Sequence, residues 1–232
     1  MFKDLSYITE IDLSCFNSYN VRSMKSMFEG CTSLASINFA NINAQNVIDM
    51  QNMFSDCYNL VSLSLTNFKT SNVKYTDFML FECSNLSFLD LSSFDFSLLE
   101  TTSYMFYNCV KLSSLVLNDI TTSNLKKMDN MFNNCLSLEY LDLSGFKTNF
   151  VEDMYRLFYG CKSLKSLNIN NFKTSSVVNM AEMFSGCLVL TSLDLSNFDT
   201  QKISNMEYMF YQCYKLTSLD LSSFNTEKVE DM

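Results

Sequence analysis

The sequence predicts an α/β solenoid of about nine stacked 26-residue repeats, and three observations support that prediction. Eight cysteines follow one another at intervals of 26 residues, without insertion or deletion. A period of this length is typical of stacked supersecondary units that cover one another's apolar faces. Each period joins an apolar pattern of helical spacing to a short apolar–polar–apolar alternation, and 47% of the residues are hydrophobic. The cysteines of this column are Cys31, Cys57, Cys83, Cys109, Cys135, Cys161, Cys187 and Cys213.

The first half of each repeat predicts a short helix. Between Val177 and Cys187, apolar residues recur at steps of three, three, one and three, which places them on one face of a helix. Residues that tolerate a left-handed backbone, such as Gly30 and Asp56, come directly before most cysteines of the column and predict the helix end. Threonines such as Thr174 lie where a helix would need its N-terminal cap.

The second half of each repeat predicts a short strand. Leu193, Asp194 and Leu195 alternate between apolar and polar, as in a strand with one buried face. Parallel strands lie ~4.8 Å apart whereas packed helices need about 8–10 Å. We therefore expect a curved stack, with parallel strands on the concave side and short helices on the convex side. Residues 1–232 are expected to form a single array, and because both ends fall within a repeat, it is predicted to be a segment without capping repeats.

Composition argues against several classes of function. The net charge is −9 and the sequence has no basic cluster, so nucleic acid is not expected as a partner. The longest apolar runs are only a few residues, which disfavours direct membrane insertion. Histidine, the commonest general base, is absent, and no nucleophile elbow or phosphate-binding loop occurs. We expect neither an enzyme nor a cofactor.

The cysteine column has three interpretations. Each cysteine continues the apolar face, which favours a row of buried, reduced thiols. Disulfides between adjacent repeats remain open, because stacked strands lie within the Cα separation of about 4.4–6.8 Å that a disulfide needs. A zinc site is disfavoured because no closely spaced C-x-x-C pair occurs. Cys15 lies outside the column and is predicted to be exposed.

A column of mostly acidic and amide residues separates the two strand leucines. Alternation along a strand points these side chains out of the sheet, onto the predicted concave face. They are either a ligand-contact strip or a solvated face that binds nothing; calcium would need six to eight oxygens around one ion, more than a single column provides. The candidate partner-binding residues are Asp12, Asn38, Asp90, Asp142, Asn168, Asp194 and Asp220.

Tyrosines outside the apolar pattern are a second candidate surface. Tyrosine is enriched at binding hot spots, but these side chains also fit simple packing over the ridges of the stack. The residues are Tyr104, Tyr107, Tyr155, Tyr159, Tyr208, Tyr211 and Tyr214.

The strand half of the repeat resembles a known family. Leu86, Leu89, Leu91 and Phe94 follow the spacing of the leucine-rich repeat core, with Phe in place of the usual Asn. The unit over 183–200 resembles that of BspA-like leucine-rich repeat surface proteins, specifically the repeat of unknown function found in mycoplasma and other bacteria. The resemblance covers the whole chain. It implies a leucine-rich-repeat-like solenoid, displayed at a cell surface or secreted, with adhesion to host proteins or other cells in some relatives.

Two functions are compatible with these patterns. The first is a non-catalytic protein-binding or adhesion module of a cell-surface protein, which contacts a protein or cell-surface ligand through its repeat surface. The alternative is a passive structural spacer or stalk with no specific ligand.

Overall fold

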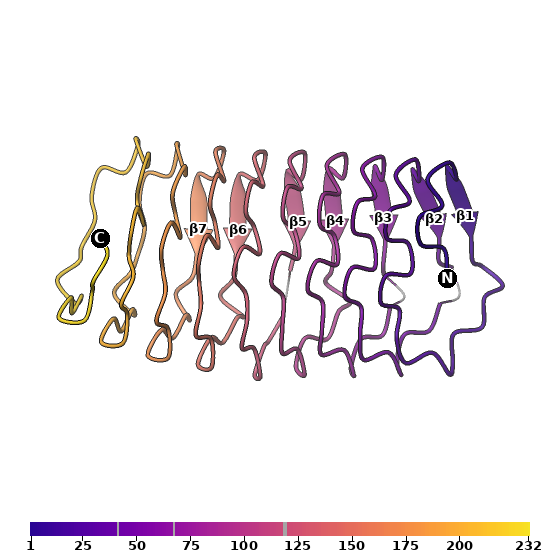
Figure 1. Cartoon of the computed structure of the whole chain (residues 1–232), viewed down its shortest axis with the longest axis horizontal. Coiled ribbons are helices and arrows are strands. Elements are labelled where there is room, and N and C mark those ends of the chain that lie inside the picture. The colour runs from indigo at the N-terminus through magenta and orange to yellow at the C-terminus, as the bar shows by residue number, and fades with distance from the viewer. Residues whose placement is uncertain (41, 67, 118–119) are drawn as a thin grey trace.

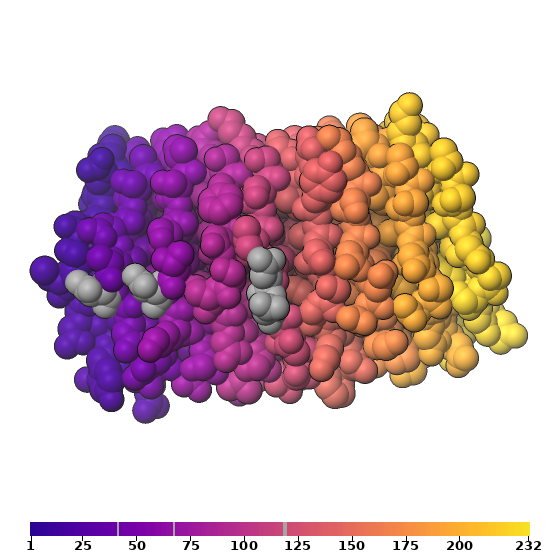
Figure 2. Space-filling model, turned by 180° about the vertical axis from the view of Figure 1, so that it is seen from behind, coloured from indigo at the N-terminus to yellow at the C-terminus, as the bar shows by residue number. Residues whose placement is uncertain are grey.

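The chain folds as an elongated stack of coils, with the N- and C-terminal ends at opposite ends of the stack (Figure 1). This computed structural model describes residues 1–40, 42–66, 68–117 and 120–232. In space-filling view the coils appear as successive bands, from indigo at the N-terminus to yellow at the C-terminus (Figure 2). The predicted solenoid is confirmed.

In the described part of the chain, seven short parallel strands lie along one side of the stack, in separately hydrogen-bonded groups of two, three and two. They pair in register, so that Ile11 faces Ile37 and Leu89 faces Leu115, one period further on. Seven strands are fewer than the nine repeats predicted, because the described segments around Leu193 and Leu219 do not pair as strands. The strands are β1 (Glu10–Asp12), β2 (Ser36–Asn38), β3 (Ser62–Ser64), β4 (Phe88–Asp90), β5 (Ser114–Val116), β6 (Tyr140–Asp142) and β7 (Ser166–Asn168).

The predicted helices are wrong: the described residues contain none. Each coil instead makes two tight turns, with a left-handed residue in each, such as Ser26 (φ 55°) and Gly30 (φ 72°). The N–H groups of these two residues donate to the carbonyl oxygens of Gln51 and Ser55 in the next coil, both at 2.9 Å. These cross-coil bonds replace the bonds from residue i to i−4 that a helix needs. A segment such as 177–187 is also shorter than the ~12–15 residues at which an isolated helix becomes even marginally stable.

The helix–strand mismatch from which the curvature was predicted is absent, because the described residues contain no helix. Parallel β-bridges such as Ser23–Asp49 and Asn179–Asn205 run along the turn-containing side of the stack. Hydrogen-bonded chains keep the same spacing on both sides, so no helix–strand mismatch bends the stack. Figure 1 shows the coils side by side along the longest axis of the molecule. We call the outward side chains of β1–β7 and their equivalents the strand face, and those of the turns at 25–30 and their equivalents the turn face.

The core consists of the apolar columns that the period predicted. Val177, Met180 and Cys187 have no exposed surface. Phe28 stacks on the Phe rings of both neighbouring coils with centroids 5.4 Å apart. A second run of stacked Phe rings extends from Phe106 to Phe210, with centroid separations of 5.3–5.8 Å. Every coil therefore covers the apolar surface of the next.

The threonines predicted as helix caps instead join neighbouring coils. Thr148 is fully buried, and its hydroxyl donates to the carbonyl oxygen of Lys173 at 2.8 Å. The same hydroxyl oxygen accepts the N–H of Lys173 at 2.7 Å. One side chain thus satisfies two backbone groups of the next coil, as buried polar groups require.

Candidate functional site

The predicted partner-binding column lies on the strand face. Asp12, Asn38, Asp142, Asp194 and Asp220 are exposed, while Asp90 and Asn168 are half-buried. Strand pairing places Asp12 beside Asn38 and Asp142 beside Asn168. The side chains therefore form a polar row along the strands, as predicted.

Each member of this column closes a turn in its own coil. Oδ1 of Asp90 accepts the N–H of Ser92, two residues later, at 2.8 Å, and Asp142 accepts the N–H of Ser144 at the same distance. The hydroxyl and then the amide of Ser92 lower the pKa of Asp90, and the same groups of Ser144 lower the pKa of Asp142. One oxygen of each side chain is therefore used by the fold. Equivalent bonds are made by Asp12, Asn38, Asn168, Asp194 and Asp220.

Two exposed aromatic residues stand on the strand face, and the sequence prediction missed them. Phe88 in β4 is 51% exposed and Tyr140 in β6 is 63% exposed. Their column otherwise contains mainly serine, such as Ser114 between them. The signal was present in the sequence, as aromatic residues in a serine column. The ammonium of Lys165, which is paired with Glu139 at 2.6 Å, lies 5.9 Å from the centre of the Tyr140 ring.

A hollow of about 620 Å³ adjoins this region of the strand face. Its lining includes Leu115, Leu117, Asp142 and Gly145. A side chain at Gly145 would meet the carbonyl oxygen of Ile120, because the two coils approach closely there. The hollow lies where the pairing of strands is interrupted, between β5 and β6.

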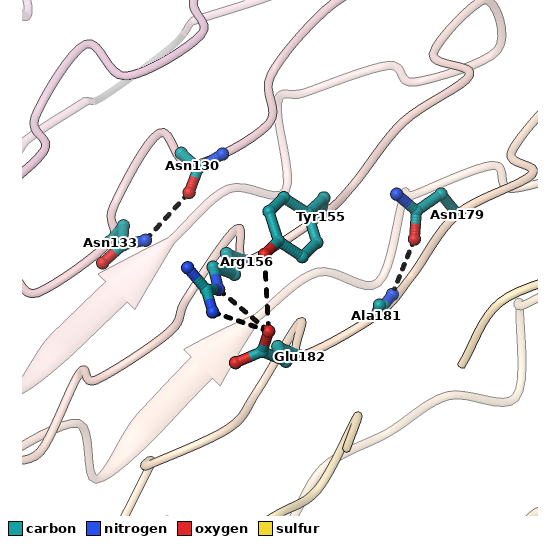
Figure 3. Close-up of polar contacts among 7 residues, drawn as sticks. All are labelled: Asn130, Asn133, Tyr155, Arg156, Asn179, Ala181 and Glu182. Atoms are coloured by element: carbon teal, nitrogen blue, oxygen red, sulfur yellow. Dashed lines mark hydrogen bonds and ion pairs between the residues drawn. The ribbon is translucent and has the colours of Figure 1, made fainter. Parts of the chain in front are cut away.

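The turn face carries most of the tyrosines singled out in the sequence, either half-buried or exposed. Tyr155 and Tyr159 hold the guanidinium of Arg156, whose Cζ lies 5.0 and 4.8 Å from their ring centres. Arg156 also donates from Nε and Nη2 to one oxygen of Glu182, at 3.0 and 2.8 Å (Figure 3). Packing against neighbours therefore accounts for this pair of tyrosines, whereas Tyr208 is 56% exposed.

Two buried amides interrupt the row of large side chains on the turn face. Asn130 and Asn133 are each 2% exposed, and Asn133 donates to Asn130 at 2.8 Å (Figure 3). They occupy the columns that carry Tyr104 and Tyr107 one coil earlier. The side-chain oxygen of Asn133 is buried without a hydrogen-bond partner in the described part of the chain. The aromatic surface is thus interrupted at this coil and resumes at Tyr155 and Tyr159 in the next one.

The cysteine column is a row of reduced thiols, as favoured from the sequence. All eight members are free; seven are buried and Cys213 is half-buried. Each thiol donates to a carbonyl oxygen of the preceding coil, as Cys57 does to Phe28 at 3.2 Å. Burial raises the pKa of Cys161 to about 12 and that of Cys213 to about 11, so these thiols stay protonated. Cys15 is exposed, as predicted.

Within the described ranges, no cluster of three or more His, Cys, Asp or Glu side chains could hold a metal ion. In the same part of the chain, no helix has the length and apolar character needed to cross a bilayer.

Several solved leucine-rich repeat structures resemble the chain, all at low identity. A leucine-rich cell surface protein from Faecalibacterium prausnitzii is 14% identical, with a TM-score of 0.32 over 90% of this chain and 76% of that one. A leucine-rich repeat protein from Bacteroides ovatus is 16% identical, with a TM-score of 0.23 over 100% and 85%. TLR13, solved in complex with ssRNA13, is 21% identical, with a TM-score of 0.43 over 89% of this chain. The chain spans only 27% of the length of that TLR13 chain. TM-scores this low carry no information about function.

The family comparison is more informative. No curated protein matches the chain. One family model matches three overlapping segments, residues 1–116, 78–185 and 126–232, which together span the whole sequence. Its description is "Mycoplasma protein of unknown function, DUF285". The chain therefore belongs to this family, and its resemblance to BspA-like leucine-rich repeat proteins is confirmed.

Proposed function

We propose that the chain is a non-catalytic protein-binding module that contacts its partner through the strand face. One observation carries this proposal: Phe88 and Tyr140 are 51% and 63% exposed in a column otherwise filled mainly by serine. Exposed aromatic side chains do not stabilise the fold, but they supply much of the energy of protein interfaces. Tyrosine and phenylalanine are enriched in such interfaces relative to the remaining surface.

The two rings are spaced to contact one partner. Phe88 and Tyr140 lie in β4 and β6, two coils apart, which corresponds to roughly 10 Å between the strands. Asp90 and Asp142 lie two residues further along the same strands and add charge beside each ring. In both carboxylates one oxygen accepts a hydrogen bond within a local turn, and the carboxylate group can accept further hydrogen bonds. The remaining members of the column, from Asp12 to Asp220, extend this polar strip along the stack.

The resemblance to BspA-like leucine-rich repeat surface proteins supports the biological setting of the proposal. Residues 1–232 act as one array, at the surface of a cell or in secreted form, and the partner is a protein or another cell-surface ligand. Adhesion is the function that best uses a long, repetitive and mostly polar surface with a few aromatic anchors.

A bead-attachment experiment tests the proposal. Beads coated with the chain are applied to cultured epithelial monolayers, and attachment is counted in parallel for the variant Phe88→Ser/Tyr140→Ser. Serine already occupies this column at Ser114 and Ser166, so the variant should fold. We expect attachment to fall about tenfold.

A matched variant controls for loss of any exposed aromatic ring. Tyr7→Ser/Tyr214→Ser removes rings that are 94% and 72% exposed outside the strand columns, and it should attach like the unaltered chain. Equal attachment by both double variants would refute strand-face recognition.

A passive spacer is the second candidate, and one observation favours it. Every member of the predicted partner-binding column makes a turn-closing hydrogen bond, so the fold alone explains why Asp or Asn recurs there. If the unaltered chain fails to attach to any cell or protein surface tested, the spacer function is the better account.

A further inference from the structure

The turn face contains a second recognition site, separate from the strand face. A pocket of about 440 Å³ opens there, and its lining includes Asp77, Phe78, Tyr104, Lys127 and Asp129. It combines aromatic rings and carboxylates, the two groups that bind organic cations. We infer that this pocket receives the guanidinium group of an arginine side chain from a protein partner.

The aromatic part of the site is a plate of four rings from two adjacent coils. Phe78 stacks on Tyr104 with centroids 4.8 Å apart and planes 8° apart, and Phe81 stacks on Tyr107 at 4.9 Å and 10°. The two stacks touch each other at 5.5–5.6 Å between centroids. A half-buried plate of this kind presents the negative ring faces to which a cation is attracted.

The carboxylates of the site have only neutral partners. Asp77 is 8% exposed and accepts bonds from the Gln51 amide, the Thr101 hydroxyl and the N–H of Ser103. Asp129 accepts the hydroxyl of Ser103 at 2.5 Å and the amide of Asn130 at 3.3 Å. In the described part of the chain neither carboxylate forms an ion pair, and Lys127, although it lines the pocket, is exposed. Among the described residues, Asp77 and Asp129 thus line the pocket without an ion-pair partner, and Lys127 lines the same pocket without pairing with either.

The molecule itself shows how this face binds a guanidinium. Arg156 occupies the same column as Phe78 and Tyr104, two coils beyond Tyr104. Its guanidinium lies over two tyrosine rings at 4.8–5.0 Å and donates twice to Glu182 (Figure 3). The pocket at Asp77 has the same kinds of group, rings and carboxylates, but no arginine of its own.

Charge and geometry both favour arginine over lysine as the partner side chain that the pocket binds. The planar guanidinium stacks on rings and donates to carboxylates at the same time, whereas an ammonium is a strongly hydrated point charge. The net charge of −9 further favours a basic partner.

The experiment uses the intact chain and a monovalent probe. The probe is N-acetyl-arginine amide, and binding is followed by NMR of ring-labelled Phe and Tyr residues. The variant Phe78→Asn/Tyr104→Asn removes the two rings of the plate that line the pocket. Asn is suited to this column, because Asn52 and Asn130 have the same left-handed backbone there (φ 55° and 56°). Tyr208→Asn, in the same column at φ 54° and 56% exposed, is the matched control.

We expect saturable shifts of the Tyr104 and Phe78 signals with the arginine probe. The double variant should bind about tenfold more weakly, while Tyr208→Asn should bind like the unaltered chain. The neutral citrulline analogue should not bind. Equal affinity for citrulline or lysine amide, an unchanged affinity in the double variant, or no saturable shift would each overturn the inference. None of these outcomes depends on attachment through the strand face, so this site and the proposed function fail independently.

Discussion

Two regions of the turn-containing side adopt one backbone with opposite side-chain chemistry. In the first region, residues 76–82 and 102–108, the first position of each segment is buried and is threonine, Thr76 or Thr102. The third position points outward and is aromatic, Phe78 or Tyr104. At 154–160 and 180–186 the buried column holds methionine, and the outward column holds the ion pair of Arg156 and Glu182. Both regions have left-handed residues at the same two positions of each coil. Both also make the same hydrogen bonds from backbone N–H groups to carbonyl oxygens of the next coil.

This comparison shows which interactions determine the coil. The backbone hydrogen bonds between coils and the two left-handed positions are common to both regions, so they determine the path of the backbone. A polar residue is tolerated inside because Thr102 donates to the carbonyl oxygen of Lys127 at 3.2 Å. The outward column is then free to differ from coil to coil, which is what a recognition surface requires.

The largest expected effect concerns the core that the two regions share. Phe106 and Phe158 are both fully buried in the same stacked row. Phe→Ala at either position should lower the free energy of unfolding by about 3–5 kcal/mol, measured by urea denaturation. Phe158→Leu is the control and should cost much less, since Leu80 occupies this column naturally. A clearly smaller loss at Phe106 than at Phe158 would show that the Thr-containing region packs more loosely.

A smaller effect is expected from the ion pair that distinguishes the second region. Arg156→Gln removes the charge that Glu182 pairs with and weakens the contacts with two tyrosine rings. We expect a loss of about 1 kcal/mol, because the pair is only half-buried. Lys165→Gln breaks a more exposed pair, with side chains 51% and 43% accessible, and should cost less than about 0.5 kcal/mol. Because Lys165 also lies 5.9 Å from the centre of one ring, that of Tyr140, equal losses in urea denaturation would mean that the closer ring contacts and the greater burial of the Arg156 pair add nothing.

A comparable or smaller loss is expected when the buried hydroxyl of the first region is removed. Thr102→Val keeps the shape of the side chain but deletes its bond to the carbonyl oxygen of Lys127. That carbonyl still accepts the N–H of Thr102 at 2.9 Å, so the expected loss is about 0.5–1.5 kcal/mol. Thr102→Ser retains the hydroxyl and serves as the control. A higher free energy of unfolding for the valine variant would indicate that the buried hydroxyl of Thr102 does not stabilise this region.

The buried apolar positions of each repeat could be predicted well from the sequence. The path of the backbone between them, a helix or two tight turns, could not. The burial of Val177, Met183 and Leu195 followed directly from the period. Steps of three, three, one and three suit a helix, but they suit a coil with two tight turns equally. The choice depends on carbonyl groups 25 residues away, such as that of Gln51 facing Ser26, and local propensity contains no information about them.

The same limit applies to the candidate sites. The position of Asp142 on an outward face followed from strand alternation, whereas the bond to Ser144 that occupies one of its oxygens needed the folded turn. Phe88 and Tyr140 could have been found by comparing columns. The pocket at Asp77 could not, because its rings and carboxylates come from different coils and meet only after stacking.

The smallest expected effect tests a feature that extends over both regions, the turn-closing carboxylates of the strand face. Because the pKa values of Asp90 and Asp142 are lowered in the folded chain, their contribution to stability is present above the unfolded pKa, about 3.9. It is lost as the pH falls through the lower folded pKa. Asp142→Asn keeps an oxygen that accepts the N–H of Ser144 but cannot titrate, as Asn168 shows one coil later. We expect the variant to be slightly less stable than the unaltered chain near neutral pH, and to lose less stability between about pH 5 and 2, so that the two chains converge at low pH; urea denaturation at each pH measures this. An identical pH dependence in both chains would show that the turn gains nothing from the charge, and that the carboxylate recurs in this column for a reason other than stability.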